Sequence, residues 1–167
     1  MARSEYYSNW LSENMHVLDY VTEDTRELLY SEKAGVYGVF FHVDGYRIAT
    51  YIGESHEVGV RLKNHMKVWF GNGFSEYWNG FSESEFVNGN VKIEFVLLAE
   101  EDNLFKRLDL EEKMVEAYIP VLQDDADGRF DKYYKGEGDR RDICIIPFKS
   151  TRKIAWEYKL KVLRECV

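Results

Sequence analysis

Two stretches of β-branched and aromatic residues, joined by a turn pair, constrain the fold of this chain more than any other feature. Residues 36–41 and 48–52 flank Asp44 and Gly45, a pair that is typical of the tight turn in a β-hairpin. Residues 54–68 follow directly, and their apolar side chains recur with helical spacing. The sequence therefore predicts a β-hairpin followed by a helix.

The remaining elements are predicted more coarsely. Residues 4–32 have the apolar spacing of one or two helices, broken near Thr22, where Thr-Glu-Asp-Thr resembles an N-cap. Residues 69–90 are rich in Gly, Asn, Ser and aromatic side chains and fit neither period, so we expect a long loop or insertion. Residues 91–99 alternate and then become continuously apolar, which predicts a third strand.

A last helix is predicted between Asp102 or Asn103, either of which can cap it, and Pro120, which ends it. Its apolar side chains at helical intervals are Leu104, Leu108, Met114, Val115 and Tyr118. Glu111 lies in the middle of this helix, near the apolar stripe.

Length and composition favour a single globular domain. The chain has 167 residues, of which 45% are hydrophobic, enough to bury a core without cross-links. Cys144 and Cys166 have no paired spacing, and neither a secretory leader nor an apolar run of membrane-spanning length is recognisable. We expect a soluble, cytoplasmic protein with reduced thiols and no membrane partner.

The net charge of -8 is distributed unevenly along the chain. Residues 1–32 carry two basic and seven acidic side chains, and residues 71–103 carry one and seven. Residues 33–70, by contrast, carry five basic and three acidic side chains, and residues 148–167 carry six and two. The two basic regions are what an electrostatic footprint confined to one face requires, although for the tail a solvated helix face is an equally good interpretation.

Arg61 and His65 stand four residues apart, so they share one face of the predicted helix, beside the tyrosines of the hairpin. A guanidinium is a planar, permanently charged fork that matches two phosphate oxygens. The alternative is a surface arginine paired with Glu54 or Glu57. No His or Cys residues stand at zinc spacings, and no glycine-rich string has a phosphate-loop pattern.

Taken in order, these residues resemble the GIY-YIG nuclease superfamily, whose pattern is a GIY string, a hairpin, a YIG string, an arginine and a later glutamate. Gly35-Val36-Tyr37 matches the first string and Tyr51-Ile52-Gly53 the second, with 13 residues between them. Arg61 stands eight residues past Gly53, and Glu111 stands nine residues before Pro120, as in the family. The resemblance covers roughly residues 34–123. Glu54 stands where a Lys is common, and Gln123 stands where many members have Asn.

The resemblance implies an α/β (α+β) fold with a small three-stranded, mostly antiparallel sheet flanked by helices. The nuclease-like core is residues 34–123, with an N-terminal helical extension at residues 1–33 and a C-terminal extension with a basic tail at residues 124–167. It also implies a Mg²⁺-dependent endonuclease that hydrolyses DNA, most often double-stranded, of the phage, mobile-element or restriction-like type. Mn²⁺ is the expected substitute for Mg²⁺.

The resemblance further assigns roles to individual residues. Tyr37 is the general base, Tyr51 orients the phosphate or water, and His65 assists by hydrogen bonding. Arg61 contacts the scissile phosphate, and Glu111 holds the metal ion, as a single carboxylate often does for Mg²⁺. Residues expected to bind substrate are Gly53, Ser55, Gln123, Lys149, Arg152 and Lys153.

Two points of chemistry and partnership stay open. Tyrosine has an ordinary pKa near ~10, so a phenolate needs a cation beside it, and the commoner role of a strand tyrosine is a half-buried aromatic. A binding or regulatory module on the same scaffold, acting through protein contacts, is one alternative, and an RNA nuclease is another. A homodimer or a protein partner bound through the acidic or aromatic surface is compatible with both.

Overall fold

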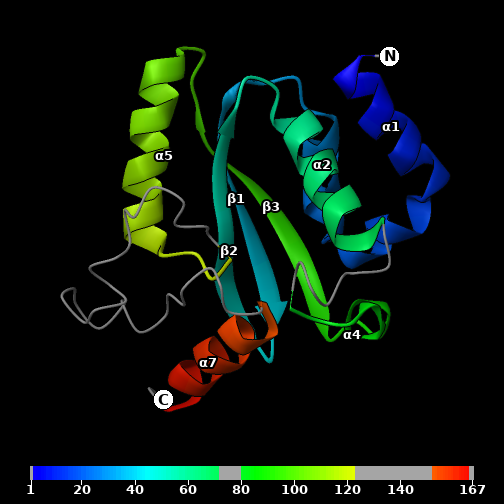
Figure 1. The fold of residues 1–167 in the computed structure, drawn as a ribbon, viewed down its shortest axis with the longest axis vertical. Helices are drawn as coiled ribbons and strands as arrows, with labels where there is room; N and C mark the ends of the chain where they lie inside the picture. The colour runs from blue at the N-terminus through cyan, green and yellow to red at the C-terminus, as the bar shows by residue number, and fades with distance from the viewer. Residues whose placement is uncertain (1, 72–79, 123–151, 166–167) are drawn as a thin grey trace.

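The protein, described by a computed structural model, is an antiparallel sheet with helices on both faces (Figure 1). The structure describes residues 2–71, 80–122 and 152–165. Three strands form the sheet in the order β2-β1-β3: β1 (Gly35–Val43), β2 (Tyr46–Ser55) and β3 (Val91–Glu100). The predicted hairpin and third strand are therefore confirmed, and so is the α+β class with a three-stranded antiparallel sheet.

One face of the sheet is covered by the N-terminal segment and by the helix that follows the hairpin (Figure 1). These elements are α1 (Arg3–Glu13), the 3₁₀ helices η1 (Met15–Tyr20) and η2 (Glu23–Tyr30), and α2 (Val58–Phe70). The fully buried side chains of this face include Leu11, Val17, Leu29, Phe41, Leu62 and Met66. The predicted helix at residues 54–68 begins later than expected, because residues 54 and 55 complete β2.

The N-terminal segment breaks twice rather than once, at Asn14 and at Val21. The break near Thr22 has a clear cause, because Val21 forms a parallel bridge with Ile93 of β3. The Thr22 N–H also donates to the Ile93 carbonyl at 2.8 Å. Backbone used to cover the free edge of β3 is extended there and cannot continue a helix.

Helix α5 (Leu104–Tyr118) covers the opposite face (Figure 1). A smaller core lies beneath it, formed by Val36, Ile52, Val115 and Ile119. Asn103 caps the helix, since its Oδ1 accepts from the Lys106 N–H at 3.0 Å. The helix ends at Tyr118 because Ile119 adopts the left-handed conformation.

The predicted apolar stripe of α5 is partly wrong. Leu104, Leu108 and Tyr118 are exposed, and Arg107 and Val115 are the buried residues of this helix. Helix α5 is thus rotated about its axis relative to the prediction. The physical cause is Arg107, which forms an ion pair with Glu54 of β2 and turns its own face of α5 toward the sheet.

The turn end of the hairpin is covered by two short segments, α4 (Glu83–Val87) and α7 (Arg152–Glu165). Trp156 of α7 stacks on Phe41 with 5.4 Å between ring centroids and 7° between planes. The prediction of one long loop at residues 69–90 was wrong at both of its described ends, because Trp69 belongs to α2 and Phe86 to α4, and both are buried. Packing against the sheet determines the helical conformation of these aromatic segments, although their local sequence favours a loop.

The start of α2 is locked against η2 by close backbone contacts. The Val58 and Gly59 N–H groups donate to the carbonyls of Lys33 and Ser31 at 2.9 and 3.0 Å. A Cβ at Gly59 would stand 2.6 Å from the Ser31 carbonyl oxygen and 2.7 Å from that of Leu29. The backbones can approach this closely only because residue 59 has no side chain.

Replacing Gly59 with alanine is therefore expected to destabilise the protein by about 1–3 kcal/mol, through overpacking. Helix propensity alone predicts the opposite sign, a gain of up to about 1 kcal/mol. Urea unfolding followed by circular dichroism measures the difference, with Asn64→Ala in the same helix as the control. A Gly59→Ala protein as stable as the wild type would contradict the contact.

Candidate functional site

The two glycine-tyrosine strings lie side by side in the sheet. Tyr37 of β1 stands directly opposite Gly53 of β2. A Cβ on Gly53 would lie 2.5 Å from Tyr37 Oη, so the missing side chain lets the phenol lie across the neighbouring strand. Gly53, predicted to bind substrate, thus shapes the space that Tyr37 occupies.

His65 of α2 is the hydrogen-bond partner of this phenol. Tyr37 Oη and His65 Nε2 are 2.8 Å apart. The imidazole ring also contacts Tyr51, with 4.7 Å between centroids, and stacks on Trp69 at 5.4 Å and 22°. Tyr37 and Tyr51 are themselves stacked at 6.3 Å. Three predicted site residues are thereby held in one aromatic cluster on the α2 face of the sheet.

Arg61 lies one helical turn before His65 and is half-buried. The charge of its guanidinium acts on the pKa of the Tyr37 phenol and on that of His65, and lowers both. Within residues 2–71, 80–122 and 152–165, no carboxylate forms an ion pair with Arg61. The alternative of a surface arginine paired with Glu54 or Glu57 is therefore not what the structure contains.

Glu111 comes to the cluster from the other side. It is half-buried on α5, and its carboxylate raises the pKa of Tyr37, although burial of the phenol raises that pKa more. Helices α2 and α5 cover opposite faces of the sheet, and β2 is an edge strand that both contact. The five predicted catalytic residues thus come from β1, β2, α2 and α5, and four of them act on a fifth, Tyr37.

The environment keeps Tyr37 protonated. Burial raises the pKa of the phenol well above its usual value, the neighbouring Tyr51 and Glu111 add to the increase, and Arg61 opposes it. The pKa of His65 shifts in the other direction, because burial, and to a smaller extent the charge of Arg61, lower it to about 3. At neutral pH the pair is therefore a phenol beside an uncharged imidazole.

With both groups uncharged, the tautomer of His65 sets the direction of the hydrogen bond. A phenol that keeps its proton donates it to His65 Nε2, in the tautomer that carries its own proton on Nδ1. The positive charge of Arg61 acts on the same phenol. Tyr37 Oη is thus polarised from both sides, and the imidazole is a proton acceptor within 2.8 Å.

Glu54, which stands where the family commonly has Lys, has a structural partner. Its carboxylate accepts from Arg107 Nε at 2.8 Å, and Arg107 also donates to the carbonyls of Glu101 and Asp102 at 3.3 and 2.6 Å. Arg107 is 5% exposed. This ion pair fastens the end of β2 to the first turns of α5, one turn before Glu111.

The residues at Glu111 fit the expected cation. A half-buried carboxylate whose charge acts on the Tyr37 phenol is the type of hard oxygen ligand that Mg²⁺ takes together with waters and substrate phosphate. Among the described residues, no group of three or more His, Cys, Asp or Glu side chains could hold a metal ion. A dedicated all-protein metal cage is thus not present in that part of the chain.

The predicted substrate-binding residues are only partly placed. Ser55 Oγ donates to the Glu57 carbonyl at 2.9 Å and accepts from the Glu57 N–H at 3.0 Å, closing the turn before α2. Gln123 and Lys149 lie outside the described residues, as do the side chains of Arg152 and Lys153.

Two residues that complete the site were missed from the sequence. Trp69 stacks on His65, and only its spacing of four from His65 along α2 pointed to it. The sequence around Arg107 is typical of a polar helix face, so nothing local indicated that this residue is buried. Its partner Glu54 lies 53 residues earlier. Such a long-range pair leaves no local signal in one sequence.

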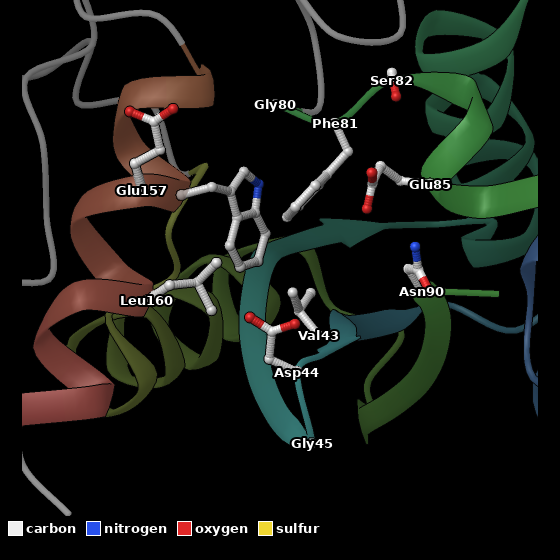
Figure 2. A pocket seen from close by; sticks show the side chains of 11 residues that line it. Val43, Asp44, Gly45, Gly80, Phe81, Ser82, Glu85, Asn90, Glu157 and Leu160 are labelled. Carbon is white, nitrogen blue, oxygen red and sulfur yellow. The ribbon is translucent and has the colours of Figure 1, made fainter. Parts of the chain in front are cut away.

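A hollow of about 790 Å³ lies elsewhere in the molecule (Figure 2). It lies at the turn end of the hairpin, between α4 and α7, where Phe81 and Trp156 face each other with ring centroids 5.0 Å apart. Asp44 of its rim forms an ion pair with Arg164. The hollow is lined by none of the five predicted catalytic residues, so we place the candidate site at the Tyr37 cluster on chemical grounds.

No protein-family model matches the chain, and comparison with curated proteins and with solved structures gave no significant match. In the described part of the chain, every helix is too short or too polar to cross a membrane. Function is therefore argued from the geometry of the cluster and from the motifs of the sequence.

The lowered pKa of His65 predicts a specific loss of stability in acid. In the unfolded chain the His65 imidazole takes up a proton near pH ~6.5, whereas in the folded protein it does so only at about pH 3. The free energy of unfolding therefore falls as pH decreases between these values. Urea unfolding at pH 7 and pH 4 measures this decrease, which should be smaller in His65→Gln. The exposed residue 56 supplies the control, and His56→Gln should match the wild type. An equal decrease in all three proteins would show that His65 takes up its proton normally.

The Arg107–Glu54 pair predicts strong coupling between α5 and β2. Arg107→Met leaves a partly buried carboxylate without its partner and should cost about 2–3 kcal/mol, less than a fully buried pair. Adding Glu54→Gln to that variant should recover part of the loss. Lys113→Met removes an exposed ion pair with Asp109 of the same helix and should leave stability essentially unchanged. Additive effects of the two substitutions would contradict the coupling.

Proposed function

We propose that this protein is a metal-dependent nuclease of the GIY-YIG type that hydrolyses DNA phosphodiester bonds. The observation that carries the proposal is Arg61, a half-buried guanidinium without a carboxylate partner among the described residues, directed at the hydrogen-bonded Tyr37–His65 pair. A partly desolvated cation next to a proton-transfer pair is the arrangement that hydrolysis of an anionic ester requires.

Arg61 binds the scissile phosphate in this proposal. Its fork donates to two nonbridging oxygens and offsets the charge that increases on them in the transition state. Bound phosphate also supplies the anionic partner that the protein leaves open, so substrate binding removes the cost of burying the cation. Tyr51, stacked on Tyr37, confines the phosphate and the attacking water on one side.

Tyr37 and His65 move the proton. A phenol with a raised pKa is no base by itself, so Tyr37 takes a proton from the attacking water while its own proton passes to His65 Nε2, 2.8 Å away. The imidazolium that results is disfavoured beside Arg61 alone. The negative charge of a bound phosphate lowers that cost, which couples proton transfer to the presence of substrate.

Glu111 would hold Mg²⁺, or Mn²⁺ in its place, and the bound ion supplies charge stabilisation for the leaving oxygen. The protein's contribution is to position this carboxylate. The Arg107–Glu54 pair fixes the preceding turn of α5 against β2, so the side chain of Glu111 is presented toward Tyr37.

A binding module that acts through protein contacts is the second candidate, and one observation favours it. Leu104, Phe105 and Leu108 form an exposed apolar patch at the start of α5, with Phe105 78% exposed. Solvated apolar patches of this kind are common at protein interfaces. On this reading the Tyr37 cluster is only a packed scaffold.

The two functions are separated by nicking of supercoiled plasmid at low salt, in Mg²⁺ and in EDTA. Low salt is needed because a chain of net charge -8 makes few phosphate contacts. The wild type should nick in Mg²⁺ only, and Arg61→Ala and Glu111→Gln should each lose roughly 10²-fold or more in rate. Glu112→Gln, on the exposed side of the same helix, is the matched control and should keep full activity.

A wild type that never nicks DNA, or activity that survives both Arg61→Ala and Glu111→Gln, would reject the nuclease proposal. Cleavage of single-stranded RNA with the same dependence on Arg61 would keep the chemistry and change the substrate. Tyr37→Phe is a further test of the proton path, and its rate should fall without a change in substrate affinity.

A further inference from the structure

We propose that the hollow between the first turn of α1 and the start of α2 binds a second phosphate of the nucleic-acid backbone, next to the scissile one. This inference rests on the proposed function, and it adds a substrate subsite to which Arg3 and Ser4 contribute from outside the predicted nuclease core at residues 34–123. It also gives the N-terminal helix a role beyond packing.

The hollow has a volume of about 200 Å³, far more than the ~10–15 Å³ that one water needs. Its polar lining comes from two elements that are distant in sequence. Arg3 and Ser4 belong to α1, whereas Ser55 ends β2, His56 lies in the turn before α2, and Arg61 belongs to α2.

Charge and donor chemistry make the hollow suitable for a phosphate. Arg3 and Arg61 supply two guanidinium forks, and the hydroxyl of Ser4 and the exposed imidazole of His56 add polar groups. Planar forks match phosphate oxygens two at a time, as a single ammonium cannot. The hollow is a cationic site in a chain of net charge -8.

Glu57 is the acidic residue of the lining, and part of its charge is compensated. Its carboxylate acts on Lys63, where it opposes the decrease in pKa that burial causes. The backbone of Glu57 is meanwhile held by Ser55 Oγ at 2.9 and 3.0 Å. Two arginines against one partly compensated carboxylate leave the hollow positive.

Arg61 connects the hollow to the candidate active site. It lines the hollow, it stands one helical turn before His65, and its charge acts on the Tyr37 phenol. Successive phosphates of one strand rise by only ~3.4 Å along a duplex, so a backbone with one phosphate at Tyr37 and Arg61 brings a neighbour toward Arg3. The hollow is therefore a neighbouring subsite of one continuous strand.

The position of α1 is fixed well enough to build such a site. Lys63 Nζ donates to Ser8 Oγ at 3.0 Å, and Lys63 is 7% exposed. Lys67 stands over the Tyr6 ring at 5.0 Å. These contacts join the middle of α1 to α2, and they set the place of Arg3 one to two turns earlier.

Arg3→Gln tests the proposal, because the side chain is exposed and its loss should leave folding intact. Lys113→Gln is the matched control, since it removes one positive charge from an exposed site on α5. The first probe is inorganic phosphate, titrated while the backbone amide signals of residues 55–61 are followed by NMR. The second is a short DNA duplex, bound in EDTA so that no cleavage occurs, with affinity measured by fluorescence anisotropy at several salt concentrations.

The wild type and Lys113→Gln should show saturable phosphate shifts at residues 55–61, and Arg3→Gln should bind phosphate and DNA roughly tenfold more weakly. The slope of log affinity against log salt should decrease by about 1 in Arg3→Gln, because one phosphate contact is lost. In nicking assays KM should rise with kcat nearly unchanged. This split is expected because Arg3 does not touch the reacting atoms.

Absence of saturable shifts in the wild type, or equal DNA affinity of Arg3→Gln and Lys113→Gln, would overturn the proposal. The proposed function fails on a different result. If the wild type binds DNA through Arg3 but never nicks it, the subsite proposal stands and the nuclease proposal is rejected. If Arg3→Gln nicks DNA as well as the wild type does, the nuclease proposal stands and the subsite proposal is rejected.

Discussion

The hydrogen bond between Tyr37 Oη and His65 Nε2 connects the first strand to the helix that follows the hairpin, and the rest of the site depends on it. It forms because Gly53 leaves room for the phenol above β2, and because the stacked rings of Tyr51 and Trp69 hold the imidazole. Burial then separates the pKa values of the pair, raising that of Tyr37 and lowering that of His65. The same packing that stabilises the core thus leaves a neutral donor and a neutral acceptor in contact.

A second constraint positions the groups that would meet substrate. Arg107, almost completely buried, ties β2 to α5 through Glu54 and satisfies two carbonyls of the preceding turn. Because this pair fixes the rotation of α5, Leu104 and Phe105 remain in solvent, and Glu111 stands one turn after Arg107, where its charge acts on Tyr37. The exposed apolar patch and the placement of Glu111 are therefore two consequences of one buried ion pair.

The hairpin, the third strand and the Asn103 cap could be predicted because each depends on local turn and capping chemistry. The rotation of α5 could not, since Arg107 finds its partner 53 residues away and outweighs the apolar spacing of Leu104 and Leu108. The helical ends of residues 69–90 were missed for a similar reason, because Trp69 and Phe86 are ordered by packing on Phe41.

In the site, the motifs identified Tyr37, Arg61, His65 and Glu111 as a set, and the structure brings them to act on one phenol. The protonation state of Tyr37 could not be predicted from the sequence. The sequence required a cation beside Tyr37 if the phenol was to act as a base, and in the structure burial outweighs the charge of Arg61 and raises the pKa of Tyr37. This difference changes the proposed chemistry from a phenolate base to a proton relay through His65.

The most direct measurement of the central claim, a single site formed by Glu111 and the Tyr37 cluster, is paramagnetic broadening of the backbone NMR signals by Mn²⁺. We predict that low concentrations of Mn²⁺ broaden signals around Glu111 on α5 and around Tyr37 on β1, and that Glu111→Gln abolishes both effects. Broadening that is centred on another acidic surface, or that persists in Glu111→Gln, would contradict the account.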